Sequence, residues 1–391
     1  MGACTYNTHI TDHSVPYFQV DTEIICGAAR MAEYLPLLEG KKVGLVANHT
    51  AFVGNVHLVD TLLALSVGLK KIFSPEHGFR GTFEAGEEYG SYIDTKTGLP
   101  IVSLYGKNRK PPSVEMDELD IVLFDIQDVG VRFYTYISTM HYVMEACAEK
   151  NIPLIILDRP NPNGFYVDGP VLDTHFRSFV GMHPVPLVHG MTIAEYACMI
   201  NGENWLSSGK SQLSYVLCAG YDHTKKYKLP INPSPNLTSS RAIYLYPSLG
   251  LFEGTVISVA RGTAHPFEAF GHPDMMNASF SFTPRNLSNA PIKPPFENKI
   301  CKGIDLRTIP IDSLLQHPTV SLRWMIFAYN NMPDTKKFFN SFFHKLAGND
   351  QLRKQIENGM NEGEIKKTWQ EGLQKFKNIR KKYLLYPDFA Q

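Results

Sequence analysis

Apolar residues follow two alternating patterns in the first half of the chain. Continuous apolar runs occupy residues 42–48, 71–74, 100–105, 120–125 and 152–158. Between them, apolar side chains recur every three or four positions, as they do over residues 133–147. Unbroken runs are typical of strands buried on both faces, and the three-to-four spacing is typical of amphipathic helices. The pattern therefore predicts an α/β fold, with a parallel sheet and helices on both of its faces.

The two ends of the chain add further elements. Residues 22–38 show helical spacing, and beyond residue 215 short strand-like runs (257–263, 278–282 and 303–309) are followed by amphipathic helices. We expect an α/β domain over residues 22–230 and a smaller α+β C-terminal domain over residues 231–391. The boundary is expected within residues 215–245.

Polar side chains follow four of the predicted strands, at the point where each strand ends. They are Asn48 after the first strand, Glu76 and His77 after the second, Asp125, Gln127 and Asp128 after the next, and Asp158, Arg159 and Asn161 after the last. Because the carboxyl ends of parallel strands share one edge of a sheet, we expect these side chains to converge on a ligand crevice.

The loop after Pro75 is the richest of these segments. It holds Glu76, His77, Arg80 and Glu87. Three glycines in the same loop allow backbone angles that other residues avoid, so the loop can fold tightly around a ligand. Taken alone, the segment is equally compatible with a solvated surface loop.

Charge and cysteine content exclude several classes of protein. The 391 residues carry 38 Lys and Arg against 38 Asp and Glu, so no overall field favours nucleic acid or a membrane surface. Six scattered cysteines without a C-x-x-C pair argue against a zinc ribbon or a disulfide scaffold. No apolar stretch approaches the ~20 residues of a membrane span. The sequence specifies no oligomeric state.

The first four residues, Met1 to Cys4, resemble the end of a lipoprotein export signal whose apolar part is missing. This predicts an extracytoplasmic protein, in the periplasm or at the cell surface and tethered through Cys4. A cytoplasmic protein is the alternative.

Several chemistries lack their motifs. There is no G-x-G-x-x-G fingerprint after the first strand, no G-x-x-x-x-G-K-[ST] phosphate loop and no G-x-S-x-G nucleophile elbow. His49, His77, Asp125, Asp128 and His189 could converge, but none of them shows a tight metal-ligand spacing. We predict no cofactor and no metal, and keep a metal-dependent hydrolase using His77, Asp125 and His189 as an alternative.

Carboxylate chemistry on a neutral sugar fits the remaining residues. Glycoside hydrolysis needs a protonated carboxylic acid and a second group at the anomeric centre. Glu76 is flanked by Pro75 and Phe79 and is the candidate acid; Asp125, Asp128 and Glu87 are candidates for the second carboxylate. Candidates for sugar and carboxylate binding are Tyr105, Tyr134, Tyr136, Arg132, Arg159 and Arg261.

Each of these side chains also has a structural interpretation. Asp158 and Arg159 can form a local ion pair, Arg261 can brace a domain interface, and the tyrosines can pack a helix. Glu195 stands three residues after Thr192 and is interpreted as the second half of a capping box.

With these residues identified, the chain resembles the exo-β-N-acetylmuramidase family, bacterial glycosidases formerly catalogued as a domain of unknown function. The similarity runs from residue 22 to residue 386 and includes residues 44–48 (GLVAN), 75–81 (PEHGFRG), 125–130 (DIQDVG), 132–136 (RFYTY), 157–162 (LDRPNP), 189–192 (HGMT), 233–236 (PSPN) and 261–263 (RGT). One departure is Ser258-Val259-Ala260, where the family often has Ser-Glu-Gly before Arg-Gly-Thr.

The resemblance implies a Rossmann-like N-terminal domain, a smaller C-terminal domain and an active cleft between them. It implies release of β-linked N-acetylmuramic acid from the non-reducing ends of peptidoglycan fragments, in cell-wall degradation and recycling, with Glu76 as the general acid. A non-catalytic protein that binds cell-wall fragments is the alternative. The expected catalytic residues are Glu76, His77, Asp125 and Asp128. The expected substrate-binding residues are Asn48, Arg80, Glu87, Tyr105, Gln127, Arg132, Tyr134, Tyr136, Asp158, Arg159, Asn161, His189, Asn236 and Arg261.

Overall fold

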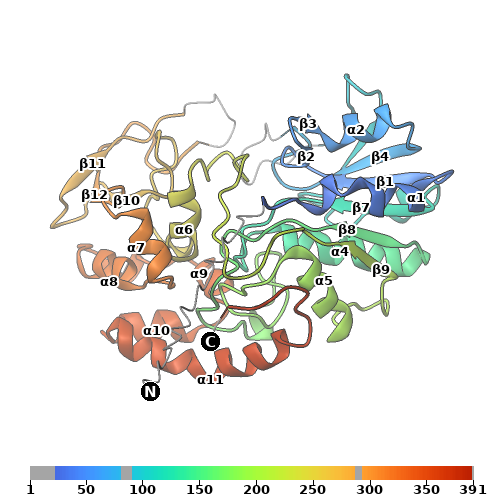
Figure 1. Cartoon of the computed structure of the whole chain (residues 1–391). Helices are drawn as coiled ribbons and strands as arrows, with labels where there is room; N and C mark the ends of the chain where they lie inside the picture. The colour runs from blue at the N-terminus through green and yellow to red at the C-terminus, as the bar shows by residue number, and fades with distance from the viewer. Residues whose placement is uncertain (1–22, 81–89, 287–292, 390–391) are drawn as a thin grey trace, which may run out of the picture.

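The central sheet has seven strands in the order β5-β6-β4-β1-β7-β8-β9 (Figure 1). The computed structural model describes residues 23–80, 90–286 and 293–389. The strands are β1 (Val43–Ala47), β4 (Leu69–Ser74), β5 (Tyr92–Ile93), β6 (Pro100–Ser103), β7 (Ile121–Asp125), β8 (Leu154–Leu157) and β9 (Leu213–Val216). All neighbouring pairs are parallel except β5 with β6. The six parallel strands lie in the order 3-2-1-4-5-6, which is that of a Rossmann fold. The predicted parallel sheet is confirmed.

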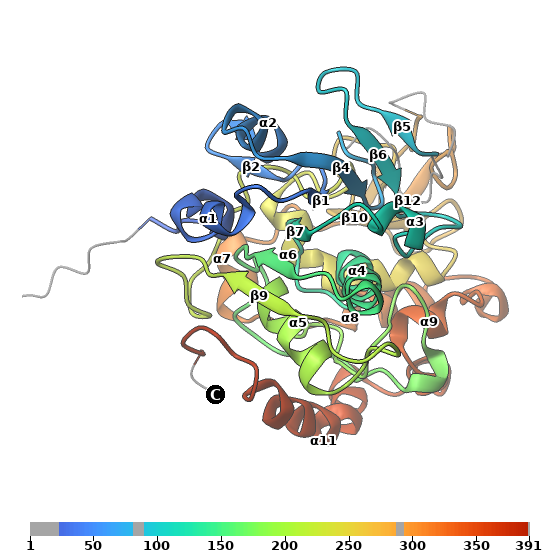
Figure 2. The ribbon, with the colours of Figure 1, turned by 90° about the vertical axis from the view of Figure 1, so that its right-hand side faces the viewer.

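Alternate residues of the central strands pack into two separate apolar clusters, one on each face of the sheet. Val46, Phe124 and Ile156 pack with α4 (Tyr136–Lys150) and α5 (Ile193–Gly202). Their neighbours in the strands, including Leu45, Leu123 and Ile155, pack with α1 (Leu35–Leu38) and α2 (Leu58–Ala64). Figure 2 shows the two helix layers on opposite sides of the strands. Burial on both faces explains why these strands are continuous apolar runs.

The helix predicted over residues 22–38 is wrong. The segment forms two 3-10 turns, η1 (Gly27–Ala29) and η2 (Met31–Glu33), before the short helix α1. Ile25 pairs with Ala219 beyond β9, and Gly27 donates to the carbonyl of Asp158 at 2.9 Å. A Cβ on Gly27 would lie 2.2 Å from the carbonyl oxygen of Val216, so this close approach requires glycine. Tertiary pairing therefore overrides the helical spacing.

The C-terminal part is a smaller α+β unit. A three-stranded antiparallel sheet has the order β10 (Ala269–His272), β12 (Cys301–Asp305), β11 (Phe280–Phe282). Its helices are α6 (Ser240–Leu249), α7 (Ile311–Gln316), α8 (Arg323–Asn330), α9 (Phe343–Ala347), α10 (Gln351–Glu357) and α11 (Glu362–Arg380). The strand predicted over residues 257–263 is wrong: Ser258 makes one bridge to Gly271, and positive φ angles at Ala260 and Gly262 turn the chain away. The domain boundary itself stays a prediction.

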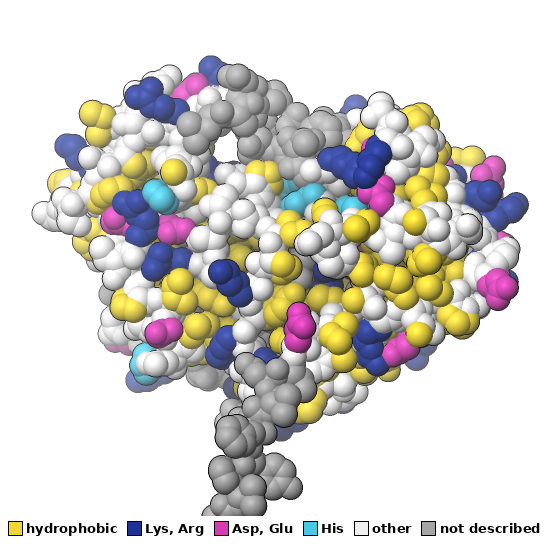
Figure 3. All heavy atoms as spheres, turned by 45° about the horizontal axis from the view of Figure 1, so that its top comes forward, with side chains coloured by type: hydrophobic (Ala, Val, Ile, Leu, Met, Phe, Trp, Pro, Cys, Tyr) yellow, Lys and Arg dark blue, Asp and Glu magenta, His cyan; other side chains and the backbone are white. Residues whose placement is uncertain are grey.

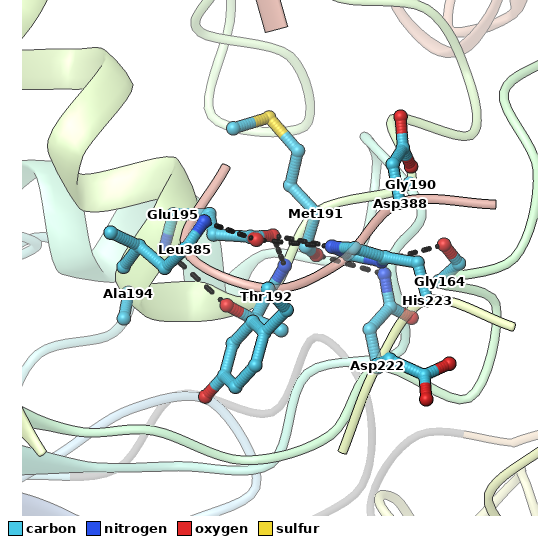
Figure 4. Close-up of polar contacts among 12 residues, drawn as sticks. Gly164, Gly190, Met191, Thr192, Ala194, Glu195, Asp222, His223, Leu385 and Asp388 are labelled. Atoms are coloured by element: carbon cyan, nitrogen blue, oxygen red, sulfur yellow. Dashed lines mark hydrogen bonds and ion pairs between the residues drawn. The ribbon is translucent and has the colours of Figure 1, made fainter. Parts of the chain in front are cut away.

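The chain beyond α11 packs against the sheet domain, where it contacts the buried pair of Glu195 and His223 (Figure 4). His223 Nε2 lies 3.0 Å from both carboxylate oxygens of Glu195, and Nδ1 donates to the carbonyl of Gly164 at 2.9 Å. Glu195 also accepts from the backbone N–H groups of Thr192 and Leu385, both at 2.9 Å. The predicted capping box is confirmed, and the same carboxylate holds the C-terminal segment in place.

Replacing Glu195 is expected to destabilise the fold strongly. Glu195→Ala leaves the wholly buried His223 without its anionic partner, which costs about 3–5 kcal/mol of unfolding free energy. Glu364 occupies the equivalent capping position on α11 at an exposed site, so Glu364→Ala is the matched control, with a cost of about 1 kcal/mol. Urea unfolding followed by circular dichroism measures both. Equal losses for the two variants would show that Glu195 acts only as a cap.

Candidate active site

A cavity of about 480 Å³ lies where the carboxyl edge of the sheet meets the C-terminal unit. Four segments of the sheet domain line it: the loops after β4 and β6, residues 133–136 leading into α4, and residues 178–180. The C-terminal side contributes Asn236, Glu253, Arg261 and Lys345. On the face shown in Figure 3, charged side chains of both signs are interspersed with apolar ones, with no patch of a single sign.

Glu76 stands at the entrance to α4. Pro75 ends the run of β4, and positive φ angles at His77 (70°) and Gly78 (76°) turn the loop into the cavity. Thr135, the N-cap residue of α4, donates its hydroxyl to Glu76 Oε2 at 2.8 Å. A positive φ at a residue other than glycine is costly and tends to occur at functional sites, which draws attention to His77.

Glu253 is a second carboxylate in the same cavity, and no sequence pattern predicted it. It lies in the 3-10 turn η4 (Gly250–Gly254), with Oε1 3.1 Å from Arg261 Nη1. Burial raises the pKa of Glu253; the Arg261 guanidinium opposes this shift, and the nearby Glu76 charge adds to it. The two carboxyl groups therefore lie close enough for the Glu76 charge to act on Glu253. In the sequence, Glu253 lies between Gly250 and Gly254 and does not follow a predicted strand, so nothing there indicated a catalytic carboxylate.

The structure brings together seven of the residues predicted from the sequence. The cavity is lined by Glu76, His77, Tyr105, Tyr134, Tyr136, Asn236 and Arg261. Tyr134 and Tyr136 both direct their hydroxyls at the carbonyl of Pro233, at 2.7 and 3.4 Å, while their rings border the cavity. Glu87 lies outside the described residues.

Asp125 and Arg159 bind each other beside the cavity instead of lining it. Arg159 Nε and Nη2 donate to the two carboxylate oxygens of Asp125 at 2.5 and 2.9 Å, and both side chains are buried. This bidentate pair joins the ends of β7 and β8. Arg80, by contrast, pairs with Asp94 at 2.9 Å. Arg80 and Arg159 both border a second, larger cavity, of about 1220 Å³.

Arg132 has a structural position. Its guanidinium is fully buried and donates to four backbone carbonyls, those of Pro170, Val185, Leu346 and Ala347, at 2.7–2.9 Å. Two of these carbonyls belong to the sheet domain and two to α9, so Arg132 joins the two parts of the molecule and lies outside the cavity lining.

Six further predicted residues are buried in the strand-end loops and do not line the cavity: Asn48, Gln127, Asp128, Asp158, Asn161 and His189. Asn161 donates to the carbonyl of Met191 at 2.8 Å, and Asp158 accepts from Ala194 N and Tyr386 Oη. Burial raises the pKa of Asp128 to about 7 and lowers that of His189 to about 3. These contacts hold the loops that carry the cavity residues.

The residues of the metal alternative are not brought together. His77 lines the cavity, Asp125 binds Arg159, and His189 packs against the ring of Tyr196. Over the described part of the chain, no three His, Cys, Asp or Glu side chains are grouped so as to hold a metal ion. A search of the same residues for a helix long and apolar enough to cross a membrane finds none.

Fold and cavity together define a two-domain α/β protein of the Rossmann-like class, whose ligand cavity holds two carboxyl groups and several tyrosines. Two family models match almost end to end: "Exo-beta-N-acetylmuramidase NamZ, N-terminal" over residues 43–241 and "Exo-beta-N-acetylmuramidase NamZ, C-terminal" over residues 244–386. The chain belongs to the NamZ exo-β-N-acetylmuramidase family.

Individual relatives agree with this assignment. The chain is 39% identical over 376 residues to the peptidoglycan β-N-acetylmuramidase NamZ of Bacillus subtilis (strain 168), covering 91% of this chain and 89% of that protein. The crystal structure of a DUF1343 family protein from Bacteroides fragilis NCTC 9343 is similar, with a TM-score of 0.87 and 46% identity, covering 94% of this chain and all of the other. A second DUF1343 protein from the same strain has a TM-score of 0.77 and 28% identity, covering 93% of this chain and 99% of the other.

Proposed function

We propose that this protein is an exo-acting glycoside hydrolase that releases β-linked N-acetylmuramic acid from the non-reducing ends of peptidoglycan fragments. The observation that carries the proposal is the pair Glu76 and Glu253 in one cavity bordered by tyrosines. Two carboxyl groups flanking the scissile bond are what glycoside hydrolysis requires. Membership of the NamZ family and 39% identity to a peptidoglycan β-N-acetylmuramidase support the substrate class.

In this proposal Glu76 is the general acid. It gives its proton to the glycosidic oxygen as the bond from that oxygen to the anomeric carbon breaks. Glu253 supplies the electron pair on the other side of the sugar, by direct attack or through a water molecule. Arg261 holds Glu253 in orientation through their 3.1 Å contact. Tyr105, which is partly exposed, offers apolar ring surface to the sugar, and the buried rings of Tyr134 and Tyr136 form the wall of the cavity behind it.

Two defined disaccharides test the activity. N-acetylmuramic acid β-linked to N-acetylglucosamine should be cleaved, with free N-acetylmuramic acid detected by mass spectrometry. The reverse disaccharide, with N-acetylglucosamine at the non-reducing end, should remain intact. Saturable binding without released sugar would favour the non-catalytic binder, and loss of cleavage on adding a chelator would favour the metal-dependent hydrolase.

Arg109 is the side chain that we expect to bind the lactyl carboxylate of muramic acid. Its guanidinium lies over the ring of Phe179, 4.4 Å from the centroid, and both residues line the cavity. A charge-assisted hydrogen bond is worth about 1.5–3 kcal/mol, so Arg109→Ala should lower kcat/KM by about 10- to 100-fold, mainly through KM. Lys345 is the other cation in the cavity that makes no salt bridge among the described residues, and Lys345→Ala is the matched control. A larger loss for the lysine variant would reassign the carboxylate to Lys345.

We also propose that the protein acts outside the cytoplasm, in cell-wall turnover. The substrate class and the signal-like residues before Cys4 support this proposal. Cell fractionation of the native organism, with immunodetection and a test for lipid on Cys4, examines it. Recovery in the cytosolic fraction would contradict it.

A further inference from the structure

Two cysteines far apart in the sequence face each other where the chain first joins the sheet. Ile25 and Ala219 exchange both backbone hydrogen bonds, at 3.0 and 2.9 Å, as an isolated antiparallel bridge. In such a pairing, the residues one step along each strand form a non-hydrogen-bonded pair with Cα atoms about 4.5 Å apart. These residues are Cys26 and Cys218. The spacing falls within the range of about 4.4–6.8 Å that a disulfide bridges.

The neighbours of Cys26 also lower the pKa of its thiol. This pKa falls to about 6, chiefly through the adjacent Cys218 side chain; the Arg159 charge and the Tyr227 hydroxyl act in the same direction against the effect of burial. Tyr227 Oη lies 3.7 Å from Cys26 Sγ, and Cys218 Sγ donates to the carbonyl of Asp158 at 3.2 Å. The lowered pKa of Cys26 favours its thiolate, which is the nucleophilic form.

The surroundings give the two cysteines different access to solvent. Cys26 is partly exposed and borders the second cavity, together with basic side chains that include Lys225 and Lys228. Cys218 is buried, 5% exposed. A small anionic disulfide can therefore approach Cys26 from this cavity, which Cys218 does not line.

We propose that Cys26 and Cys218 form a reversible disulfide that fastens the N-terminal segment to the β9 side of the sheet. The oxidant is a disulfide compound, such as oxidised glutathione or an oxidised thiol oxidoreductase. The Cys26 thiolate attacks one sulfur of the oxidant and expels the other as a thiolate. The Cys218 thiol then gives its proton to that thiolate, and the resulting Cys218 thiolate attacks Cys26 Sγ and releases the second half of the oxidant as a thiolate. Two electrons pass from the protein to the oxidant, which leaves as one thiol and one thiolate.

Position distinguishes this pair from the other described cysteines. Cys147 and Cys301 are buried and Cys198 is partly exposed. Burial raises the pKa of these three thiols, as it does that of Cys218, so Cys26 is the one described cysteine whose pKa is lowered. The disulfide would close a covalent loop from residue 26 to residue 218. It would hold residues 25 and 26 beside the chain that follows β9. The inference does not depend on the proposed hydrolase activity, and a disulfide of this kind is suited to an oxidising compartment.

Peptide mapping tests the proposal directly on the full chain. The folded, reduced protein is incubated with oxidised glutathione, blocked with N-ethylmaleimide at low pH, digested without reductant and examined by mass spectrometry. We expect one linked peptide pair joining Cys26 and Cys218, and a melting temperature higher by about 5 °C than that of the reduced protein. Cys26→Ser and Cys218→Ser should each abolish the linked pair and the temperature shift, while Cys147→Ser, as a control, should keep both.

Two results would overturn the proposal, and both come from the wild-type chain, so they do not depend on the variants folding. One is a stable glutathione adduct on Cys26 with Cys218 still free. The other is no loss of thiols at either position under conditions that oxidise a small dithiol.

Discussion

Glu76→Gln is expected to lower kcat/KM on the natural disaccharide by about 10²–10⁴-fold, because the amide cannot donate a proton to the leaving oxygen. Glutamine keeps the size of the side chain and can still accept the 2.8 Å hydrogen bond from Thr135, so the fold and the cavity are retained. Reducing-sugar release from the disaccharide measures the loss, and unchanged thermal unfolding confirms that the variant is folded.

An activated substrate separates the role of Glu76 from a general loss of function. A 4-nitrophenolate leaving group needs little protonation, so Glu76→Gln should retain much more activity on 4-nitrophenyl N-acetylmuramide than on the disaccharide. Equal losses on both substrates would show that Glu76 is not the acid. Near-wild-type turnover of the disaccharide by the folded variant would remove Glu76 from the mechanism altogether.

Glu253→Gln is expected to lower turnover of both substrates by about 10²–10⁴-fold, since the second carboxylate acts at the anomeric centre whatever the leaving group. If Glu253→Gln instead spares the activated glycoside and Glu76→Gln does not, the two roles are exchanged. Glu268 is a matched control: it is a buried glutamate near Arg241, with which it forms a 3.7 Å ion pair outside the cavity lining. Glu268→Gln should leave turnover almost unchanged.

The pH profile provides an independent test of Glu253. In the proposed role Glu253 must be ionised, and burial raises its pKa, so activity should fall on the acid side at a higher pH than for an ordinary glutamate. Arg261 opposes this shift, so Arg261→Ala should move the acid limb of kcat/KM further up in pH, and Arg261→Lys should restore it in part. An acid limb that stays in place when Arg261 is removed would show that Glu253 does not set it.

The local sequence was sufficient to predict those strands and caps whose residue pattern depends only on their own burial or on near neighbours in the chain. β1, β7 and β8 are buried on both faces, and a strand in that position must be apolar throughout. The same reasoning located Glu76 and His77, because they follow a strand whose carboxyl end lies on the ligand edge. The capping box at Thr192 and Glu195 could also be predicted from the sequence, since its two residues are three positions apart.

Other sites could not be predicted because their partners are distant in the chain. Asp125 and Asp128 follow a strand just as Glu76 follows β4, yet Asp125 binds Arg159 and Asp128 is buried away from the cavity. In the sequence Glu253 resembles any acidic residue of a loop, and only the fold places it in the same cavity as Glu76. The chain at residues 22–38 has helical spacing, but its pairing with Ala219 and the close contact at Gly27 decide its conformation.

The sequence by itself thus determined the parallel sheet, the edge at which polar residues gather, and Glu76 within it. Only the tertiary structure decided which carboxyl group shares the cavity with Glu76, which arginines form ion pairs and which cysteines lie opposite each other. The physical reason is that apolar periodicity records whether a residue is buried, while ion pairs and thiol contacts depend on which distant residue is buried beside it.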